Sequence, residues 1–366
     1  MSVLEQQKYW LALKFIPRLA NATKLKLINQ HSELGLFKLC QDQLKQCGLN
    51  PAQQQAILKP DWHKINTIIE QCQHFNISMI NITDKNYPSL LKQAHNPPNL
   101  LFYQGNVKLF NQPQVAIVGS RSASISAKEH AKKFANQLSQ NGIVITSGLA
   151  IGIDSCAHRG ALEAKGSTIA VVATGLDQVY PRRHKELAAE ILNCNGLIVS
   201  EYIPGSPPNP GCFPKRNTII SGMSLGTFVV EAQIRSGSLI SARSALEQNR
   251  EVFAMPGAIN NPQTKGCHYL IKQGAILVDE VDDILSVLDL QGLSGLYNSE
   301  PKKIKNNHQQ DLFIDPLLSS VDYETTSVDT VVSRSQLPTE EVLTRLLTLE
   351  LRGLVTAVPG GYIKLN

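Results

Sequence analysis

The fold is decided by the stretch Val115-Ala-Ile-Val-Gly-Ser-Arg121, in which four apolar residues run directly into a glycine turn. An apolar run without polar alternation suits a strand that is buried on both faces of a sheet. Further runs of this kind follow, and segments with helical periodicity separate them. Strand–helix alternation sustained over about 170 residues predicts a doubly wound parallel sheet, an extended Rossmann-like α/β fold. The later runs lie at 143–146, 168–173, 197–200, 227–230, 251–254 and 275–278.

The sequence before this alternation has a different character. Its short helical runs are interrupted by proline and glycine, which predicts a helical domain of the SAM or helix-hairpin-helix kind over residues 1–85. The sheet domain is then expected over 86–290, and the polar stretch 291–313 is interpreted as a linker.

Residues 314–366 form a third predicted unit. Helical segments are expected near 316–322 and 328–334, and a further helix begins at Pro338-Thr-Glu-Glu. A short hairpin follows around Pro359-Gly-Gly. Three helices and a terminal hairpin predict a winged-helix domain. Its core is assigned to the apolar residues of the last helix, Val342, Leu343, Leu346, Leu347 and Leu349.

Composition excludes several classes of protein. The seven cysteines are an odd number without CxxC or CxxH spacing, so neither a disulfide framework nor a zinc ribbon is expected. No apolar run reaches the roughly 20 residues of a membrane helix, and the first residues do not resemble a secretory signal. These features predict a cytoplasmic protein without a metal site and without a membrane partner.

Charge is distributed unevenly along the chain. Residues 1–110 carry a net charge of +6, residues 111–290 of +1, and residues 291–366 of −2. An anion site in the central region must therefore be built from individually placed groups rather than from a general positive field. The acidic tail is poorly suited to holding a phosphate backbone.

The ends of the predicted strands carry several turns rich in glycine and serine. In an open parallel sheet these turns share one rim, where backbone N–H groups and helix N-termini favour an anionic ligand. The sequence lacks GxxxxGK[ST], GxGxxG and GxSxG motifs, so a P-loop, a dinucleotide site and a serine elbow are not indicated. The turns begin at Gly119-Ser-Arg, Ser147-Gly-Leu-Ala, Thr174-Gly-Leu, Arg235-Ser-Gly and Met255-Pro-Gly.

Basic and aromatic residues accompany this rim. Phe213, Lys215 and Arg216 follow a proline-rich loop at the start of a predicted helix, and they combine a stacking surface with two cations. This combination is typical of proteins that hold single-stranded nucleic acid without reading its sequence. Phe213 could instead fill the core, and the two cations could be a solvated helix start. Asp154 and His158, at i and i+4, could form a catalytic acid–base pair, but they are interpreted as a helix cap and a packing residue.

The motifs together resemble the DNA-processing protein DprA (Smf) family. The resemblance is dense over about 115–285, and the flanking helical and winged-helix domains agree with the family's layout. Thr218 departs from the family, which usually has arginine after Phe-Pro-x-Arg-Asn. The motifs are Gly119-Ser-Arg, Ser147-Gly-Leu-Ala-Ile-Gly-Ile-Asp, Gly175-Leu-Asp, Ser200-Glu-Tyr, Phe213-Pro-Lys-Arg-Asn, Val230-Glu-Ala, Ser236-Gly-Ser-Leu-Ile and Arg250-Glu-Val-Phe-Ala-Met-Pro-Gly.

The resemblance implies a homodimeric protein that binds single-stranded DNA, protects incoming strands during natural transformation and loads RecA recombinase onto them. It implies no catalysis and no cofactor. The strand-binding residues implied by the motifs are Gly119, Ser120, Arg121, Phe213, Lys215, Arg216 and Asn217.

Two other functions are compatible with parts of the sequence. Leu225-Gly-Thr-Phe-Val-Val-Glu231 partly resembles the region of lysine-decarboxylase-like nucleotide phosphoribohydrolases that carries a catalytic acid, which would make Glu231 that acid. The Pro-Gly-Gly that precedes this region in those enzymes is absent here. A transcription regulator acting through the winged helix is the second alternative, and the negative charge of the tail argues against it.

Overall fold

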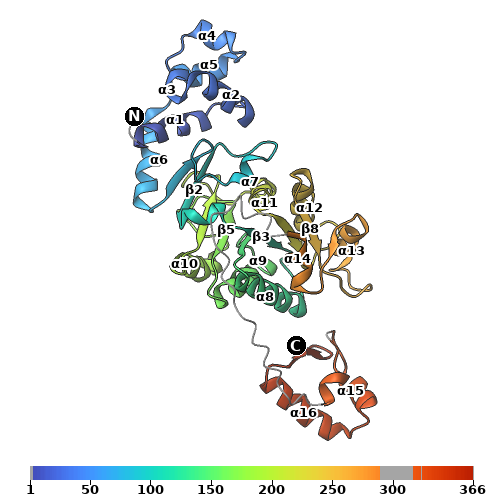
Figure 1. The fold of residues 1–366 in the computed structure, drawn as a ribbon. Coiled ribbons are helices and arrows are strands. Elements are labelled where there is room, and N and C mark those ends of the chain that lie inside the picture. Colours follow the sequence, from blue (N-terminus) through green and yellow to red (C-terminus); the bar gives the residue numbers. More distant parts are fainter. Residues whose placement is uncertain (1–2, 289–315, 323, 366) are drawn as a thin grey trace. The chain divides into compact units, whose positions relative to one another are not determined.

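The chain was analysed as a computed structural model, which describes residues 3–288, 316–322 and 324–365. Its N-terminal part is a group of helices packed around buried apolar residues that include Trp10, Leu11 and Leu36 (Figure 1). Several of these helices begin with side-chain caps, since Ser32, Asn50 and Asp61 accept hydrogen bonds from backbone N–H groups. The helices are α1 (Val3–Lys14), α2 (Asn21–His31), α3 (Glu33–Leu36), α4 (Gln41–Gln46), α5 (Pro51–Leu58) and α6 (Trp62–His74).

The region after the helices contains a nine-stranded sheet, in the order β1-β2-β6-β5-β4-β3-β7-β8-β9. From β3 the chain winds outward through β4, β5 and β6, then crosses to β7 on the other side of β3. The sheet is therefore doubly wound, as the sequence predicts. The strands are β1 (Ser78–Asn81), β2 (Leu100–Gly105), β3 (Gln114–Val118), β4 (Val144–Ser147), β5 (Thr168–Val172), β6 (Leu197–Ser200), β7 (Gly226–Val229), β8 (Glu251–Ala254) and β9 (Ile276–Leu277).

The sequence does not predict β1 and β2. These two strands precede the strand–helix alternation, and β2 pairs antiparallel with both β1 and β6. The start of β2, Leu100-Leu-Phe, is buried without alternation. Short runs of this kind do not distinguish a strand from a buried helix by periodicity. β1 also lies within the range 1–85 that is expected to be helical.

Helices connect the strands and bury the sheet. α9 packs against β3, β4 and β5, while α11 and α12 pack on each other and place their N-termini beside the ends of β3 and β7. The helices are α7 (Ser89–Lys92), α8 (Ile125–Gln140), α9 (Ile153–Glu163), α10 (Lys185–Asn193), α11 (Cys212–Met223), α12 (Gly237–Glu247), α13 (Lys265–Lys272) and α14 (Val281–Leu288), with 3-10 turns at Val107–Asn111 and Arg182–His184.

The C-terminal unit has its own apolar core, which includes Leu317, Val331 and Ile363. The predicted helices and hairpin are present, whereas the predicted linker 291–313 lies outside the described residues. Val342, Leu346 and Leu349 are buried as expected, but Leu343 and Leu347 are exposed, so their assignment to this core is wrong. The elements are a 3-10 turn (Pro316–Ser320), α15 (Val328–Ser335), α16 (Thr339–Leu351), β10 (Val355–Val358) and β11 (Gly361–Lys364).

Candidate nucleic-acid interface

A pocket of about 510 Å³ opens at the carboxyl ends of β3 and β7. These neighbouring strands are where the winding direction reverses, which is the position at which doubly wound sheets bind ligands. The pocket therefore lies where the fold alone predicts a site. Its lining residues are Val118, Gly119, Ser120, Arg121, Ser122, Ala150, Asp154, Arg216, Asn217, Ile220, Gln233, Ser236, Gly237, Ser238, Ser241 and Gln263.

The turn after β3 forms one wall of this pocket. Its backbone is fixed because Ser120 donates its N–H to the carbonyl of Glu231 at 2.7 Å. Glycine is required at position 119, since a Cβ atom there would lie 2.5 Å from Cγ1 of Ile153. Gly152 is in the left-handed region at φ +83°, and a Cβ there would collide with the carbonyl of Ser120. Close packing of these two turns explains Gly119 and Gly152.

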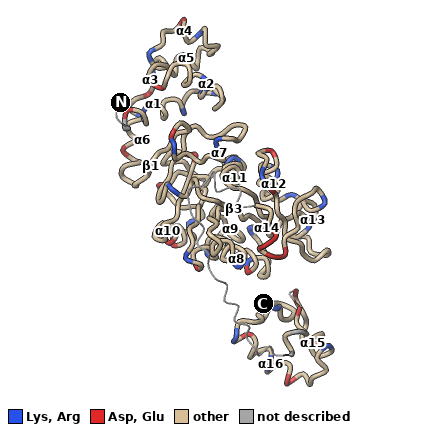
Figure 2. The backbone as a smooth tube through the Cα atoms, viewed as in Figure 1, with Lys and Arg blue, Asp and Glu red and all other residues tan. Residues whose placement is uncertain are grey.

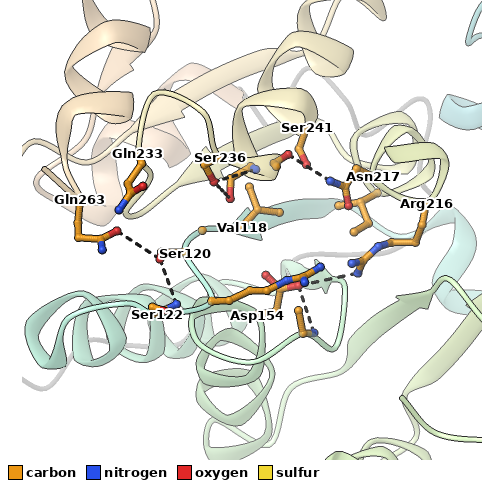
Figure 3. Close-up of a pocket in the computed structure, with 16 residues that line it drawn as sticks. Val118, Ser120, Ser122, Asp154, Arg216, Asn217, Gln233, Ser236, Ser241 and Gln263 are labelled. Carbon is orange, nitrogen blue, oxygen red and sulfur yellow. Dashed lines mark hydrogen bonds and ion pairs between the residues drawn. The ribbon is translucent and has the colours of Figure 1, made fainter. Parts of the chain in front are cut away.

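A buried ion pair forms the floor. Nη1 of Arg216 lies 3.8 Å from Oδ2 of Asp154, and both side chains are less than 10% exposed (Figure 3). Nη1 also donates to the carbonyl of Val171, while Asp154 accepts the N–H groups of Gly148 and Ala150. Burial raises the pKa of the Asp154 carboxyl, and the guanidinium and the two N–H donors oppose that shift. The pair thus ties α11 to the turn after β4.

This geometry corrects two expectations. Arg216 was expected to be an exposed cation at a helix start, either binding nucleic acid or solvated, yet the residue is 4% exposed and ion-paired. Asp154 was expected to cap its helix, but Gly152 occupies the N-cap position of α9. Asp154 instead holds the turn that precedes the helix. Both differences arise because these residues, distant in sequence, meet under the pocket.

Arg121 and Phe213 meet at the mouth of the pocket. The Arg121 guanidinium carbon lies 5.1 Å from the Phe213 ring centroid, and that of Arg216 lies 5.9 Å from it. Tyr180, 42% exposed, places its ring centroid 6.0 Å from that of Phe213. Phe213 is only partly buried, so it does not fill the core. An exposed cation and two accessible rings thus stand together at one edge of the pocket.

The N-terminus of α12 forms the opposite wall, which the sequence reasoning did not assign. Ser236 is the N-cap and accepts the N–H of Ser238. Gln263, from the loop after β8, approaches the hydroxyl of Ser120 at 3.5 Å. The Arg235-Ser-Gly turn was recognised as part of the rim, and that signal could have identified Ser236. Nothing in the sequence marked Gln263.

The remaining predicted site residues divide into two groups. Asn217 lines the pocket and donates its side-chain N–H to the carbonyl of Gly237, which joins α11 to α12. Lys215 is exposed on α11 and does not line this pocket. Five of the seven predicted residues therefore line the pocket. Phe213 is not a lining residue, but its ring lies beside Arg121, which is one. Lys215 lies outside the pocket.

Individually placed charges, rather than a general positive field, give the pocket a preference for an anionic ligand. Figure 2 shows basic and acidic positions interspersed along the elements around the sheet. Within the pocket, Arg121 and Arg216 outnumber Asp154, and the N-terminus of α12 adds a partial positive charge. The arrangement favours an anion, and the neighbouring rings favour one that carries a flat apolar group.

The candidate catalytic groups are not arranged for catalysis. His158 contacts Thr168 rather than Asp154, with Nδ1 2.7 Å from the Thr168 hydroxyl. Glu231, the acid of the phosphoribohydrolase alternative, is 1% exposed and does not line the pocket. No observation in the site favours that alternative.

Within the described ranges, no three His, Cys, Asp or Glu side chains are grouped to hold a metal ion. None of the helices in those ranges is long and apolar enough to cross a membrane.

The fold and the pocket define a class, the doubly wound α/β proteins with a pocket at the sheet's switch point. Within this class the chain belongs to the DprA/Smf family of DNA-processing proteins. The model of the family described as DNA recombination-mediator protein A matches residues 78–289. An SMF/DprA SAM domain model matches 4–70, and a DprA winged helix domain model matches 315–361.

Individual relatives agree with this assignment. Protein Smf of Escherichia coli K12 is 44% identical over 325 residues, which cover 88% of this chain and 87% of the relative. The crystal structure of DNA processing protein A from Streptococcus pneumoniae is similar with a TM-score of 0.68 at 38% identity, covering 76% of this chain and 97% of that one. DNA processing protein A from Helicobacter pylori is similar with a TM-score of 0.54 at 32% identity, covering 60% and 98%; that structure concerns the protein's unique single-stranded DNA binding mode.

Proposed function

We propose that this protein binds single-stranded DNA, without catalysing a reaction, in the pocket between β3 and β7. The observation that carries the proposal is the exposed guanidinium of Arg121 over the ring of Phe213 at the pocket mouth. A cation beside an accessible ring suits a phosphate next to an unstacked base. The Helicobacter pylori relative, whose structure concerns single-stranded DNA binding, gives independent support.

The lining residues suggest how a strand is held. A backbone phosphate accepts hydrogen bonds from the N–H of Gly237 and the hydroxyl of Ser238 at the N-terminus of α12, and is neutralised by Arg121. Gly119 and Ser120 allow the strand to approach the turn after β3. Arg216 is a positioning residue, because its charge is already used by Asp154.

The aromatic edge supplies selectivity for single strands. Phe213 and Tyr180 offer ring faces to a base, and a stacked base contributes about 1–3 kcal/mol without sequence preference. Bases in a duplex are already stacked on each other. We therefore expect the protein to prefer a single strand over a duplex. Lys215 stands outside the pocket, where it can meet the next phosphate of a passing strand.

The test is a fluorescence-anisotropy titration of the full chain with a mixed-sequence strand and with the duplex of the same sequence. We expect tighter binding to the strand at every salt concentration. The log–log slope against salt should be about −0.7 for each neutralised phosphate. Equal affinities for strand and duplex would refute the proposed site.

We further propose that the protein acts as a homodimer and loads RecA recombinase onto single strands taken up in natural transformation. Membership of the family described as DNA recombination-mediator protein A supports this role. The experiment measures RecA ATP hydrolysis on single strands precoated with a single-strand-binding protein. The chain should shorten the lag before hydrolysis, and an unchanged lag would contradict the role while leaving strand binding intact.

A further inference from the structure

Two lysines of the N-terminal helices are placed where the helical region meets the sheet region. Lys14 is half-buried at the end of α1, and Lys24 is only 6% exposed near the start of α2. α2 is bound to the chain just before β2, because Asn21 donates its side-chain N–H to the carbonyl of Pro97 and Asn99 donates to the carbonyl of Asn21, each at 3.1 Å. Both helices belong to the same compact unit as the strands of the sheet. The two ammonium groups are therefore held at a fixed place in this unit.

Glu201 is the carboxylate that influences both lysines. It directly follows β6, lies in the Ser200-Glu-Tyr motif and does not line the pocket. Burial lowers the pKa of both lysines, that of Lys24 to about 8, and the charge of Glu201 opposes the shift. The ammonium of Lys215, on α11, is close enough to lower the pKa of Lys14 further, and Lys14 does the same to Lys24. Lys215, Lys14 and Lys24 are thus successive neighbours around Glu201, and we call these three residues the lysine cluster.

The lysine cluster has more positive charge than Glu201 can neutralise. Within the described ranges, the ammonium groups of Lys14 and Lys24 make no hydrogen bond and no ion pair. Lys24 nevertheless remains protonated near pH 7, because its pKa is about 8. A buried ammonium group without a bonded partner is costly, and a bound anion offsets that cost. The lysine cluster is therefore suited to an anionic ligand.

The fold places the lysine cluster on the same rim as the pocket. β3, β4, β5 and β6 are parallel neighbours, so their carboxyl ends lie along one edge of the sheet. Glu201, at the end of β6, is three strand spacings or roughly 14 Å from the pocket at the end of β3. Lys215 connects the two places, since it directly precedes Arg216 of the pocket floor and is a neighbour of Lys14. A strand that leaves the pocket beside Phe213 and crosses Lys215 therefore reaches the rest of the lysine cluster.

We propose that the lysine cluster is a second phosphate site, which binds the backbone of a single strand after the strand leaves the pocket. This inference rests on the proposed binding of single-stranded DNA between β3 and β7. The site contacts phosphates rather than bases, so it adds affinity and lengthens the bound segment without adding sequence preference. Glu201 is a positioning residue, because its charge favours the protonated form of both buried lysines.

The experiment compares Lys24→Met with Lys26→Met in the full chain. Lys26 is exposed on the same helix, so both variants lose one positive charge but only Lys24→Met loses it from the lysine cluster. Each variant is titrated by fluorescence anisotropy, over a range of salt concentrations, with a strand of about 16 nucleotides, the upper end of single-strand site sizes. An unlabelled dinucleotide, too short to reach from the pocket to the end of β6, is measured as a competitor.

Lys24→Met should reduce the magnitude of the log–log salt slope by about 0.7, the contribution of one phosphate, and should weaken binding of the long strand about five-fold at about 0.1 M salt. Lys26→Met should change neither quantity appreciably. Competition by the dinucleotide should be the same in both variants. The Tm of Lys24→Met should not fall, because an apolar chain of similar length removes the cost of a buried charge.

Three results would overturn the second site: unchanged affinity of Lys24→Met for the long strand, an equal loss in Lys26→Met, or an equal loss for the dinucleotide. Arg121→Ala separates these results from a failure of the proposed function. If Arg121→Ala weakens competition by the dinucleotide while Lys24→Met binds the long strand normally, the pocket binds DNA and the lysine cluster does not. If Arg121→Ala binds both ligands normally, the pocket itself is refuted.

Discussion

Two arginines of the pocket have opposite environments. Arg121 is exposed and stands over Phe213, whereas Arg216 is buried against Asp154. The first is placed to bind a ligand, and the second holds the floor of the pocket together. Substitution of the two arginines should therefore have different effects, a loss of ligand binding for Arg121 and a loss of stability for Arg216.

Phe213→Ala should weaken binding of single-stranded DNA about 5- to 150-fold, because it removes a stacking face worth about 1–3 kcal/mol. Phe75→Ala is the control, since Phe75 is a 40% exposed ring on the N-terminal helical region. Anisotropy titration of both variants checks the prediction. Equal losses of affinity in the two variants would mean that Phe213 does not contribute a stacking contact of its own.

Arg216→Ala should lower the free energy of unfolding by about 3–5 kcal/mol, because it leaves the Asp154 carboxyl buried without its counter-charge. Arg121→Ala should change that free energy by less than about 0.5 kcal/mol and should instead weaken DNA binding. Urea unfolding and a binding titration on each variant separate the two effects. A destabilised Arg121→Ala protein with normal affinity would reverse the roles assigned here.

The pocket residues in the turn after β3 are easier to predict from the sequence than the buried residues of the pocket. Gly119, Ser120 and Arg121 follow a recognisable strand, so their place on the rim could be predicted. The burial of Arg216 could not, because its partner Asp154 lies 62 positions earlier and only the tertiary fold brings them together. Gln263 was missed for the same reason.

At the scale of elements, His158 joins α9 to β5. The Thr168 hydroxyl donates to the carbonyl of Ile145, so Thr168 must accept from Nδ1 of His158. Nε2 has no hydrogen-bond partner. Burial, followed by the influence of His184 and Arg216, lowers the pKa of His158 to about 3. The imidazole therefore stays neutral in the folded protein at mildly acidic pH.

Acid should consequently destabilise the fold through this one contact. The unfolded chain binds a proton at His158 below about pH 6.5 and the folded protein does not, so stability falls as pH drops from there toward about 3. This linkage alone should remove about 2 kcal/mol between about pH 7 and pH 5. His158→Gln, although less stable near neutrality, should lose that part of the pH dependence in urea unfolding. His63→Gln, at an exposed position, should retain it, and identical slopes in both variants would contradict the assignment.

The strands and helices could be predicted from the sequence where they alternate along the chain. Buried strands without polar alternation define β3 to β8, because each is bounded by a helix of contrasting periodicity. β1 and β2 fall outside that alternation, and their pairing with β6 depends on tertiary contacts rather than on local pattern. Leu343 and Leu347 were misplaced because apolar periodicity alone does not distinguish a buried helix face from an exposed one.

At the scale of the whole molecule, the residues that line the pocket all belong to the sheet region and none to the winged helix. The pocket is complete within the sheet, and the region after residue 290 carries a net charge of −2. The first turn of α16 contains Glu340 and Glu341, and Arg345 is paired with Glu341. We therefore expect the C-terminal unit to contribute little to binding a phosphate backbone.

Deleting residues 314–366 should leave affinity for a short oligonucleotide that accommodates one molecule within about tenfold of the full chain. The comparison is a titration of both proteins at matched ionic strength. A loss greater than tenfold, or about 1.4 kcal/mol, would mean that the winged helix binds DNA.

The central claim is that single-stranded DNA occupies the pocket between β3 and β7. Ultraviolet crosslinking of an oligothymidine strand to the full chain, followed by peptide mass spectrometry, tests it most directly. We predict adducts on Phe213 or Tyr180, the two rings at the pocket mouth, and a strong reduction of these adducts in Arg121→Ala. Adducts confined to the N-terminal helices or to residues 316–365, with none at either ring, would contradict the account.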